Sequence, residues 1–253
     1  MKKQIVFHED YCKVYTSDPA ADAGRMEAII KELQDCKFIN PKPSKDREIL
    51  LVHTETHLSR VKLSRGQVYP MALLAAGGAL LASEYTCKYR EAMFALIRPP
   101  GHHASPEGFW GFCYFNNIAI GVKKLLYDKK INKAAIIDFD MHFGDGTSNT
   151  FSASPEVVYY HVRGGTRTQF IQNLKDFCDN TVNVDLIAVS AGFDRHKDDW
   201  GGLLTTGDYH TIGKIIKKFS KDKCEGRRFA VLEGGYNHNV LGKNVRSFID
   251  GFY

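Results

Sequence analysis

Short runs of β-branched and other apolar residues alternate along this chain with segments of helical periodicity. This alternation predicts an α/β fold with a mainly parallel sheet covered by helices, because parallel strands need crossover connections, which are usually helices. The predicted strands are 5–7, 49–52, 92–97, 134–137, 157–160, 186–190 and 229–232. The predicted helices include 70–84, 116–127, 169–177, 208–219 and 240–252, and a further helix that contains Met26, Ile29, Ile30 and Leu33.

The chain has the composition of an ordinary globular protein, with 43% hydrophobic and 25% charged residues. No Ser/Gly run, Pro-rich tract or block of like charge interrupts it, so we predict a single domain over residues 1–253. The net charge is +5, but the lysines and arginines are scattered and no recognition motif accompanies them. This pattern argues against a nucleic-acid partner.

The cysteines and the apolar runs indicate the compartment. The six cysteines are widely spaced and form no C-x-x-C pair, which favours free thiols in a reducing environment. The longest apolar run, 71–82, is shorter than the about 20 residues that a membrane-spanning helix needs. The N-terminal apolar stretch, 5–7, is too short for a signal peptide. We therefore expect a cytoplasmic protein without a membrane partner.

Polar residues directly follow four of the predicted strands. Two histidines follow strand 92–97, a cluster of acids follows 134–137, Asp194 follows 186–190, and Tyr236 follows 229–232. In open α/β sheets the functional site lies beyond the carboxyl ends of the strands. We therefore expect these four loops to meet at one edge of the sheet.

The segment from Asp138 to His142 is the strongest local signal. In extended backbone Asp138, Asp140 and His142 point to one side, directly after a buried strand, where unpaired charges are costly. Asp and His are suitable zinc ligands, so the pattern predicts a metal site. The alternative is the start of a helix that the acids, Asp145 included, would cap.

A metal site of this kind needs one more anionic group from a neighbouring loop. Asp194 is our choice because it lies closest to the end of its strand. Asp198 and Asp199 are rivals that lie further along the same loop.

His102, His103 and Tyr236 are the candidate proton-transfer and hydrogen-bonding groups. Two acids, Asp138 and Asp145, are available to orient the imidazoles, and a histidine oriented by a carboxylate is a common general base. The phenol of Tyr236 follows two glycines and could donate a hydrogen bond to a developing oxyanion. The alternatives are an exposed turn for the histidines and a packed loop aromatic for the tyrosine.

Taken together, these pieces resemble the histone deacetylase and acetylpolyamine amidohydrolase family. The matching segments occur in the family's order, from about Met71 onward, and are RPPGHHA (98–104), GFCYFNN (111–117), IDFDMHFGDG (137–146), SAGFD (190–194) and EGGY (233–236). The resemblance implies a three-layer arginase/deacetylase-like fold with a central sheet of about eight strands. It also implies one zinc ion per chain and an N-acetylated substrate, either an acetyl-lysine protein or peptide or a small acetamide.

The resemblance also assigns roles to individual residues. The implied zinc ligands are Asp140, His142 and Asp194. The implied catalytic residues are His102, His103, Tyr236, Asp138 and Asp145, with His102 paired to Asp138 and His103 to Asp145. The implied substrate-binding residues are Gly111, Phe112 and Gly235. Within this set His103 would be the general base and acid, Tyr236 would polarise the carbonyl, and Phe112 would form one wall of the acyl channel.

Several segments depart from the family's pattern. In 17–25, only the proline and the arginine correspond to the usual motif, and the rim loop that normally follows Lys62 is missing. Between His161 and Asp185 the second channel aromatic has no counterpart. These departures predict a shallow, open pocket or one that another subunit closes, so an oligomer is one of the two expectations.

A monovalent cation is the other cofactor that the resemblance raises. The family often binds K⁺ behind the zinc through main-chain oxygens around 138–142, with the help of a serine. Tyr159 is interpreted as the residue in the place of that serine, which leaves K⁺ binding open.

Three other functions compete with deacetylation of acetyl-lysine. An acetylpolyamine deacetylase often carries an acidic residue seven positions after the last zinc aspartate, where this chain has Gly201. A two-metal ureohydrolase would show a further aspartate where this chain has Gly192. A non-catalytic reader of acetylated ligands would have a broken set of chemical residues, whereas here the set is complete.

Overall fold

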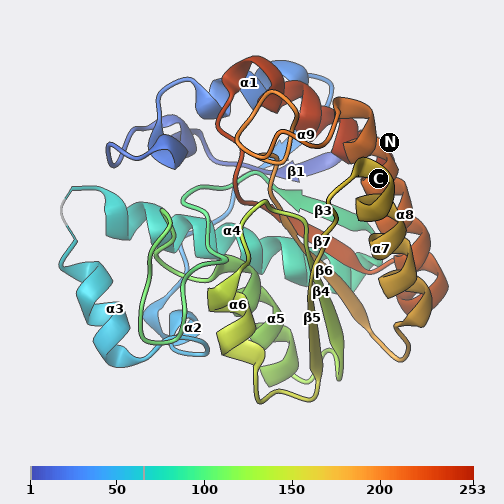
Figure 1. The fold of residues 1–253 in the computed structure, drawn as a ribbon. Coiled ribbons are helices and arrows are strands. Elements are labelled where there is room, and N and C mark those ends of the chain that lie inside the picture. The colour runs from blue at the N-terminus through green and yellow to red at the C-terminus, as the bar shows by residue number, and fades with distance from the viewer. Residues whose placement is uncertain (1, 65) are drawn as a thin grey trace.

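The computed structural model of the chain describes residues 2–64 and 66–253, and within them a parallel sheet lies between two layers of helices (Figure 1). The sheet has seven strands in the order β2-β1-β3-β7-β6-β4-β5, against the about eight that we expected. Every pair of neighbouring strands is parallel. The predicted α/β class and three-layer arrangement are therefore confirmed.

The strands are β1 (Gln4–Val6), β2 (Lys37–Ile39), β3 (Ala92–Ala95), β4 (Ala134–Asp138), β5 (Val157–His161), β6 (Leu186–Ala191) and β7 (Arg228–Leu232). The α-helices are α1 (Arg25–Glu32), α2 (Asp46–Ile49), α3 (Glu55–Lys62), α4 (Val68–Tyr89), α5 (Asn117–Tyr127), α6 (Asp145–Phe151), α7 (Arg167–Asn180), α8 (Thr206–Cys224) and α9 (His238–Phe252). Two short 3-10 helices, η1 (Glu9–Cys12) and η2 (Pro19–Ala21), precede α1.

The four central strands are buried along their whole length. Every residue of β3, β7, β6 and β4 is buried, because helices cover both faces of the sheet. Helices α4 and α5 pack on one face, whereas α8 packs on the other together with its neighbours α7, α9 and α1 (Figure 1). A strand covered on both sides reads as a continuous apolar run, which explains why the sequence pattern located these four strands.

Two short elements near the N-terminus differ from the prediction. The predicted strand 49–52 is wrong: residues Asp46–Ile49 form α2, and the chain then turns. The Glu48 carboxylate accepts a hydrogen bond of 2.6 Å from the backbone N–H of Lys45, so local capping favours a helix start there. The edge strand β2 was not predicted, because its three residues are all at least partly exposed and carry little apolar pattern.

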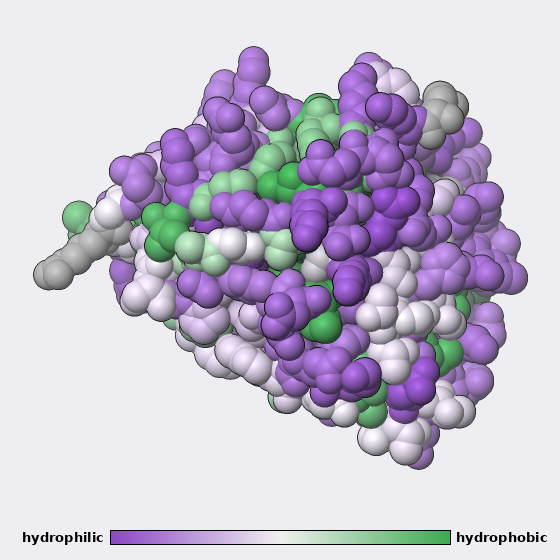
Figure 2. Space-filling view, turned by 90° about the horizontal axis from the view of Figure 1, so that it is seen from above, coloured by the Kyte–Doolittle hydropathy of each residue, from purple (hydrophilic) through white to green (hydrophobic). Residues whose placement is uncertain are grey.

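The surface and the helices also bear on the expected partners. Figure 2 shows the molecule from the side on which α1 and α9 lie, and hydrophilic side chains cover most of that face. The hydrophobic side chains there are gathered in small groups between the polar ones. Among residues 2–64 and 66–253, no helix combines the length and the apolar character that a membrane crossing requires.

Candidate active site and metal centre

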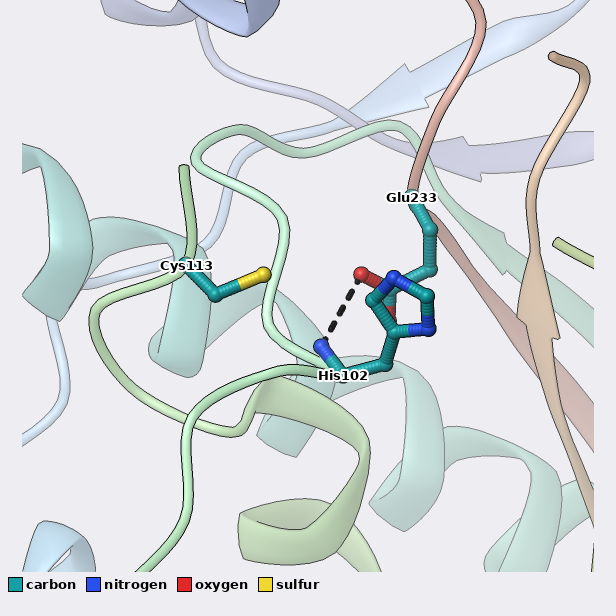
Figure 3. A group of neighbouring side chains, drawn as sticks. All are labelled: His102, Cys113 and Glu233. Atoms are coloured by element: carbon teal, nitrogen blue, oxygen red, sulfur yellow. Dashed lines mark hydrogen bonds between the residues drawn. The ribbon is translucent and has the colours of Figure 1, made fainter. Parts of the chain in front are cut away.

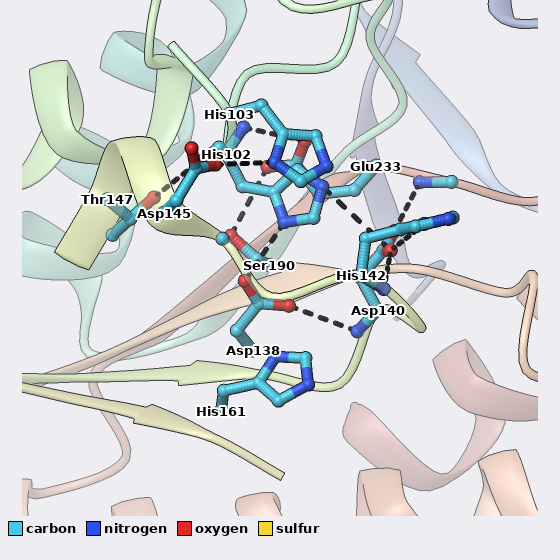
Figure 4. A network of polar contacts seen from close by, with 12 residues as sticks. His102, His103, Asp138, Asp140, His142, Asp145, Thr147, His161, Ser190 and Glu233 are labelled. Atoms are coloured by element: carbon cyan, nitrogen blue, oxygen red, sulfur yellow. Dashed lines mark hydrogen bonds and ion pairs between the residues drawn. The ribbon is translucent and has the colours of Figure 1, made fainter. Parts of the chain in front are cut away.

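The loops that follow β3, β4, β6 and β7 meet at the carboxyl edge of the sheet. This convergence follows from the strand order, because these four strands are direct neighbours in the sequence β3-β7-β6-β4. Figure 4 shows the resulting network, in which two histidines of the loop after β3 approach the acids that follow β4. The structure therefore brings together the side chains that the sequence placed on four separate loops.

Asp140, His142 and Asp194 form a compact group. One potential ligand atom from each residue lies within 4.8 Å of the others. His142 Nδ1 lies 3.0 Å from Asp194 Oδ2 and 3.3 Å from Asp140 Oδ1. Both carboxylates are buried, and among the described residues Asp194 Oδ2 has no N–H or O–H donor other than the His142 imidazole. Two buried carboxylates beside a single imidazole fit a divalent cation such as zinc.

Backbone groups hold the two carboxylates in place. Asp140 Oδ2 accepts a hydrogen bond of 2.8 Å from the N–H of Gly234, and Asp194 Oδ1 accepts one of 2.9 Å from the N–H of Met141. A Cβ at Gly192 would collide with Asp140 Oδ2, and a Cβ at Gly234 would lie 2.8 Å from Asp194 Oδ2. The two glycines therefore let the backbone approach the carboxylates closely.

The protonation states at this group also fit a cation site. Burial, followed by the charge of Asp140, raises the pKa of Asp194 to about 7. Hydrogen bonds with Asp140 and Asp194 raise the pKa of His142 to about 10. A divalent cation would neutralise the carboxylates in place of the protons that Asp194 and His142 hold without metal. We therefore expect metal binding to release protons.

The two rival acids serve other purposes. Asp199 Oδ2 accepts hydrogen bonds of 2.8 Å from the backbone N–H groups of both Tyr236 and Asn237. Asp198 forms a surface ion pair of 2.7 Å with Lys197. Asp199 therefore fixes the backbone of the tyrosine, and neither acid belongs to the group around Asp140.

The two adjacent histidines each contact a carboxylate. His102 Nδ1 lies 3.0 Å from Asp138 Oδ2, and His103 Nδ1 lies 2.7 Å from Asp145 Oδ1 (Figure 4). Burial opposes charging of His102, but the nearby Asp140 and Asp138 raise its pKa well above the ordinary value. Burial, and then the charge of His102, lower the pKa of His103 to about 4. At neutral pH the imidazole of His103 is therefore neutral, and the Asp145 carboxylate holds it in place.

Asp145 lies at the start of α6, so it both begins a helix and holds His103. Its second oxygen, Oδ2, accepts a hydrogen bond of 2.8 Å from the indole of Trp110, whose ring lies 4.0 Å from that of His103. Gly111 has a φ of +59°, and a Cβ there would lie 2.5 Å from His103 Cδ2. Trp110 was not predicted, although its place directly before Gly111 and Phe112 was a usable signal.

Tyr236 lies between two aromatic side chains. Its ring stacks on Trp200 at 4.0 Å and meets Phe112 edge-on at 6.0 Å. Burial, and then the charges of Asp140 and Asp194, raise the pKa of Tyr236, so its phenol keeps its proton. Trp200 was not predicted either. Its ring centroid also lies 6.1 Å from that of His142, and the residue is 51% exposed.

The neighbouring Gly235, with φ +120°, turns the chain toward Tyr236. Its carbonyl accepts a hydrogen bond of 2.9 Å from Arg25 Nε, and the same buried guanidinium donates at 2.6 Å to the carbonyl of Glu233. Arg25 is the arginine of the segment 17–25, so this part of the family's pattern positions the tyrosine loop.

A second buried group contains His102, Cys113 and Glu233 (Figure 3). Glu233 Oε2 accepts hydrogen bonds from the N–H groups of Gly101, at 2.7 Å, and His102, at 3.2 Å. The hydroxyl of Ser190 donates to Glu233 Oε1 at 3.2 Å. The carboxylate is thus used to hold the histidine loop against β7, a role that the position of Glu233 directly after a buried strand could have indicated.

Comparisons with known proteins add to this geometry. The sequence pattern of the histone deacetylase domain matches residues 20–170 and 161–252. A probable deacetylase of Archaeoglobus fulgidus is 31% identical over 92% of this chain and 81% of its own length. A probable deacetylase of Methanothermobacter thermautotrophicus is 29% identical over 91% of the chain and 84% of its own length. The polyamine deacetylase HDAC10 of Danio rerio is 28% identical over 95% of the chain, which spans 46% of that protein.

Proposed function

The chain belongs to the histone deacetylase family, and from this premise we propose that it is a zinc-dependent deacetylase acting on an N-acetylated amine such as acetyl-lysine. The observation that carries the proposal is the buried pair of carboxylates, Asp140 and Asp194, that His142 Nδ1 approaches at 3.3 and 3.0 Å. The neighbouring imidazole of His103 is neutral at neutral pH. Such a site offers a cation and a base together.

Asp140, His142 and Asp194 would hold the zinc ion, which polarises an acetyl carbonyl and makes water more acidic when it is bound. His103 takes a proton from the attacking water at Nε2, because its Nδ1–H is donated to Asp145, and the oxygen of that water bonds to the acetyl carbon. Tyr236 donates its O–H to the carbonyl oxygen as negative charge develops there. The His103 imidazolium then gives the proton to the amine nitrogen as the acetyl C–N bond breaks, which releases the amine and acetate.

The proposed substrate channel would have a second aromatic wall, which the sequence did not predict. Phe112 and Trp200 both contact the Tyr236 ring, at 6.0 and 4.0 Å. We assign to Trp200 the part of the second channel aromatic that is absent between His161 and Asp185. The wall thus comes from the loop after β6 and not from the shortened loop after β5.

Two glycines favour acetyl-lysine over the competing substrates. A Cβ at Gly201 would lie 2.6 Å from Arg195 Cα and 3.0 Å from the carbonyl oxygen of Asp194, so an acidic gatekeeper has no room there. A Cβ at Gly192 would collide with the Asp140 carboxylate, which leaves no room for the further aspartate of a two-metal ureohydrolase. Because the chain is similar to a polyamine deacetylase, acetylated polyamines are the second candidate substrate class.

The test compares acetate release from an acetyl-lysine peptide and from an acetylated polyamine, with and without a chelator. We expect the peptide to be the better substrate, chelation to abolish turnover, and added zinc to restore it. A preparation that is fully active without transition metal would contradict the proposal, and a faster rate on the polyamine would favour the second candidate.

A matched pair of tyrosine variants tests the catalytic group. Tyr236→Phe should lower kcat by about 10²–10³-fold, the usual effect of losing one oxyanion donor, while the zinc content stays unchanged. Tyr15→Phe is the control, because the Tyr15 hydroxyl is buried and has no hydrogen-bond partner in the described part of the chain. Equal activity of the two variants would remove Tyr236 from the mechanism.

A further inference from the structure

Arg195 directly follows the metal-site residue Asp194, and its guanidinium lies beneath the loop that carries Asp140 and His142. Its Nε donates a hydrogen bond of 3.1 Å to the carbonyl oxygen of Asp140. One terminal nitrogen donates at 3.1 Å to the carbonyl of Met141 and at 3.5 Å to that of Val162. The positive charge of this side chain therefore sits against main-chain oxygens of the metal loop.

The same nitrogen of Arg195 lies 3.1 Å from Nε2 of His161. A guanidinium has only donors, so His161 Nε2 is the acceptor and the imidazole is neutral. The plane of Arg195 also lies over the ring of Phe170, with 5.2 Å between Cζ and the ring centroid. Contacts from three elements therefore fix the guanidinium: the loop after β4, the end of β5, and α7.

This arrangement does not fit the K⁺ ion that the family resemblance implies behind the zinc. The oxygens of Asp140, Met141 and Val162 already accept hydrogen bonds from Arg195, and the carbonyl of Asp138 accepts one of 2.8 Å from the N–H of Val162. A second cation among these oxygens would lie within a few ångströms of the guanidinium and be repelled by it.

Tyr159 does not change this conclusion. Its hydroxyl donates at 2.9 Å to Asp138 Oδ2 and accepts at 3.0 Å from the N–H of Gly144, so it holds the Asp138 side chain. The β5 residue beside the guanidinium is His161, two positions later. The interpretation of Tyr159 as the residue in the place of a cation-binding serine is therefore not supported by its contacts.

We propose that Arg195 is a built-in cation that replaces the monovalent ion behind the metal centre. It fixes the carbonyls of the metal loop and offsets the negative charge of Asp138, Asp140 and Asp194, so that this protein needs no K⁺. Arg195 is a positioning residue, since it acts through the ligands and not on the substrate. The inference rests on the proposed zinc centre, but it predicts a salt response that can be measured without turnover.

The experiment compares the wild-type protein with Arg195→Ala and Arg195→Lys. Zinc affinity is measured by competition with a chelator, and thermal stability is measured in the metal-free protein. Both are measured in KCl and in tetramethylammonium chloride at about 150 mM, where the two salts screen charges equally. Lys197→Ala is the control, because Lys197 lies in the same loop and, within residues 2–64 and 66–253, its ammonium pairs with Asp198 on the surface.

We expect the wild type and Lys197→Ala to show the same zinc affinity and melting temperature in both salts. Arg195→Ala should lose about 10–100-fold in zinc affinity, as is typical when a group that supports metal ligands is removed. KCl or free guanidinium should restore part of that affinity and raise the melting temperature of this variant. The zinc affinity of Arg195→Lys should lie between those of the wild type and Arg195→Ala. An ammonium keeps the positive charge but lacks the planar set of donors of a guanidinium.

Two results would overturn the proposal. One is a wild-type protein whose zinc affinity or melting temperature depends specifically on K⁺. The other is a folded Arg195→Ala variant with unchanged zinc affinity and no response to K⁺. If Arg195→Ala does not fold, the wild-type salt comparison and Arg195→Lys decide the question. If the protein binds no zinc, the proposed function fails, while the response of the metal-free variants to K⁺ still tests the replacement.

Discussion

His102 and His103 are neighbours in the chain, but their surroundings give them different protonation states at neutral pH: His102 is charged and His103 is neutral. His102 lies between Asp138 and Asp140, with its Nε2 3.8 Å from Asp140 Oδ1, and these acids keep it protonated. His103 has one carboxylate partner, Asp145, and a charged histidine beside it, which keeps it neutral. Only His103 can therefore accept a proton from water.

This difference predicts the acid limb of the pH profile. Because the pKa of His103 is lowered from about 6.5 to about 4, its neutral form persists in mild acid and is lost only as the pH falls through that lowered pKa. A zinc ion bound nearby would lower the pKa of His103 further, because its positive charge disfavours the imidazolium. We therefore expect kcat/KM to stay high down to about pH 5, as a pH profile with zinc content measured in parallel would show.

The variant Asp145→Asn checks the assignment. The neutral amide removes the carboxylate charge that raises the pKa of His103, so the acid limb should move to lower pH while kcat falls. An acid limb at or above pH 6.5 in the wild-type protein would contradict this account.

Trp200 offers a second prediction for a single residue. Trp200→Ala removes the stack on Tyr236 and one wall of the proposed channel, so KM for an acetyl-lysine peptide should rise about 2–10-fold, the worth of one aromatic pair. Trp200→Phe should retain most of the affinity. Tyr127→Ala, which removes another highly exposed aromatic, is the control in the same steady-state assay.

The sequence predicted which residues meet at the carboxyl edge of the sheet, because each lies in a short motif at the end of a buried strand. It missed Trp110, Trp200 and Arg195, whose roles depend on contacts between different loops. Trp200 lies six positions after Asp194, and nothing local shows that the loop returns to Tyr236. Such contacts need the three-dimensional path of the loop.

Among the elements, α4 shows how closely a helix is fitted to its surroundings. The backbone N–H of Ser44 donates at 2.8 Å to the carbonyl of Leu73, so the segment before α2 lies directly against this helix. A Cβ at Gly77 would collide with the carbonyl oxygen of Lys42. The glycine is therefore required by packing, although glycine weakens a helix elsewhere.

Gly77→Ala should consequently destabilise the protein by about 1–3 kcal/mol, the usual cost of overpacking, in chemical denaturation. The matched control is Gly207→Ala in the first turn of α8, where the nearest atom to a Cβ is 4.0 Å away. That variant should be as stable as the wild type or slightly more stable. Equal stability of the two variants would show that α4 can move away from Lys42 at no cost.

The elements themselves were predicted unevenly, for a physical reason. The central strands and the long helices have strong periodic patterns because burial dictates them. The short elements β2 and α2 have little apolar content, so local capping at Lys45 and an edge pairing with β1 decided their structure. The pairing order of the strands was likewise not readable from the pattern, since it depends on contacts between distant segments.

At the scale of the whole molecule, the proposed metal centre should contribute to the stability of the folded protein as well as to its chemistry. Zinc that binds only the folded state stabilises it by about 4 kcal/mol when its free concentration is a thousand times Kd. For a protein of this size that corresponds to a rise in Tm of about 8–16 °C. A thermal melt before and after chelation measures this directly.

The control for the melt is Asp194→Asn, which removes one ligand charge. This variant should show no zinc-dependent shift, and its Tm without metal should equal or exceed that of the metal-free wild type, because a buried charge has been removed. A wild-type Tm that is unaffected by chelation would contradict the assigned metal centre.

The position of β7 has a consequence for how the protein is made. Residues Arg228–Leu232 leave the ribosome after the other six strands, yet they lie between β3 and β6. Without them no strand pairing joins β2-β1-β3, followed by His102 and His103, to β6-β4-β5, followed by Asp140, His142 and Asp194. The last strand to emerge therefore joins the two halves of the candidate site, and it brings Tyr236 and the Gly234 N–H that holds Asp140 with it.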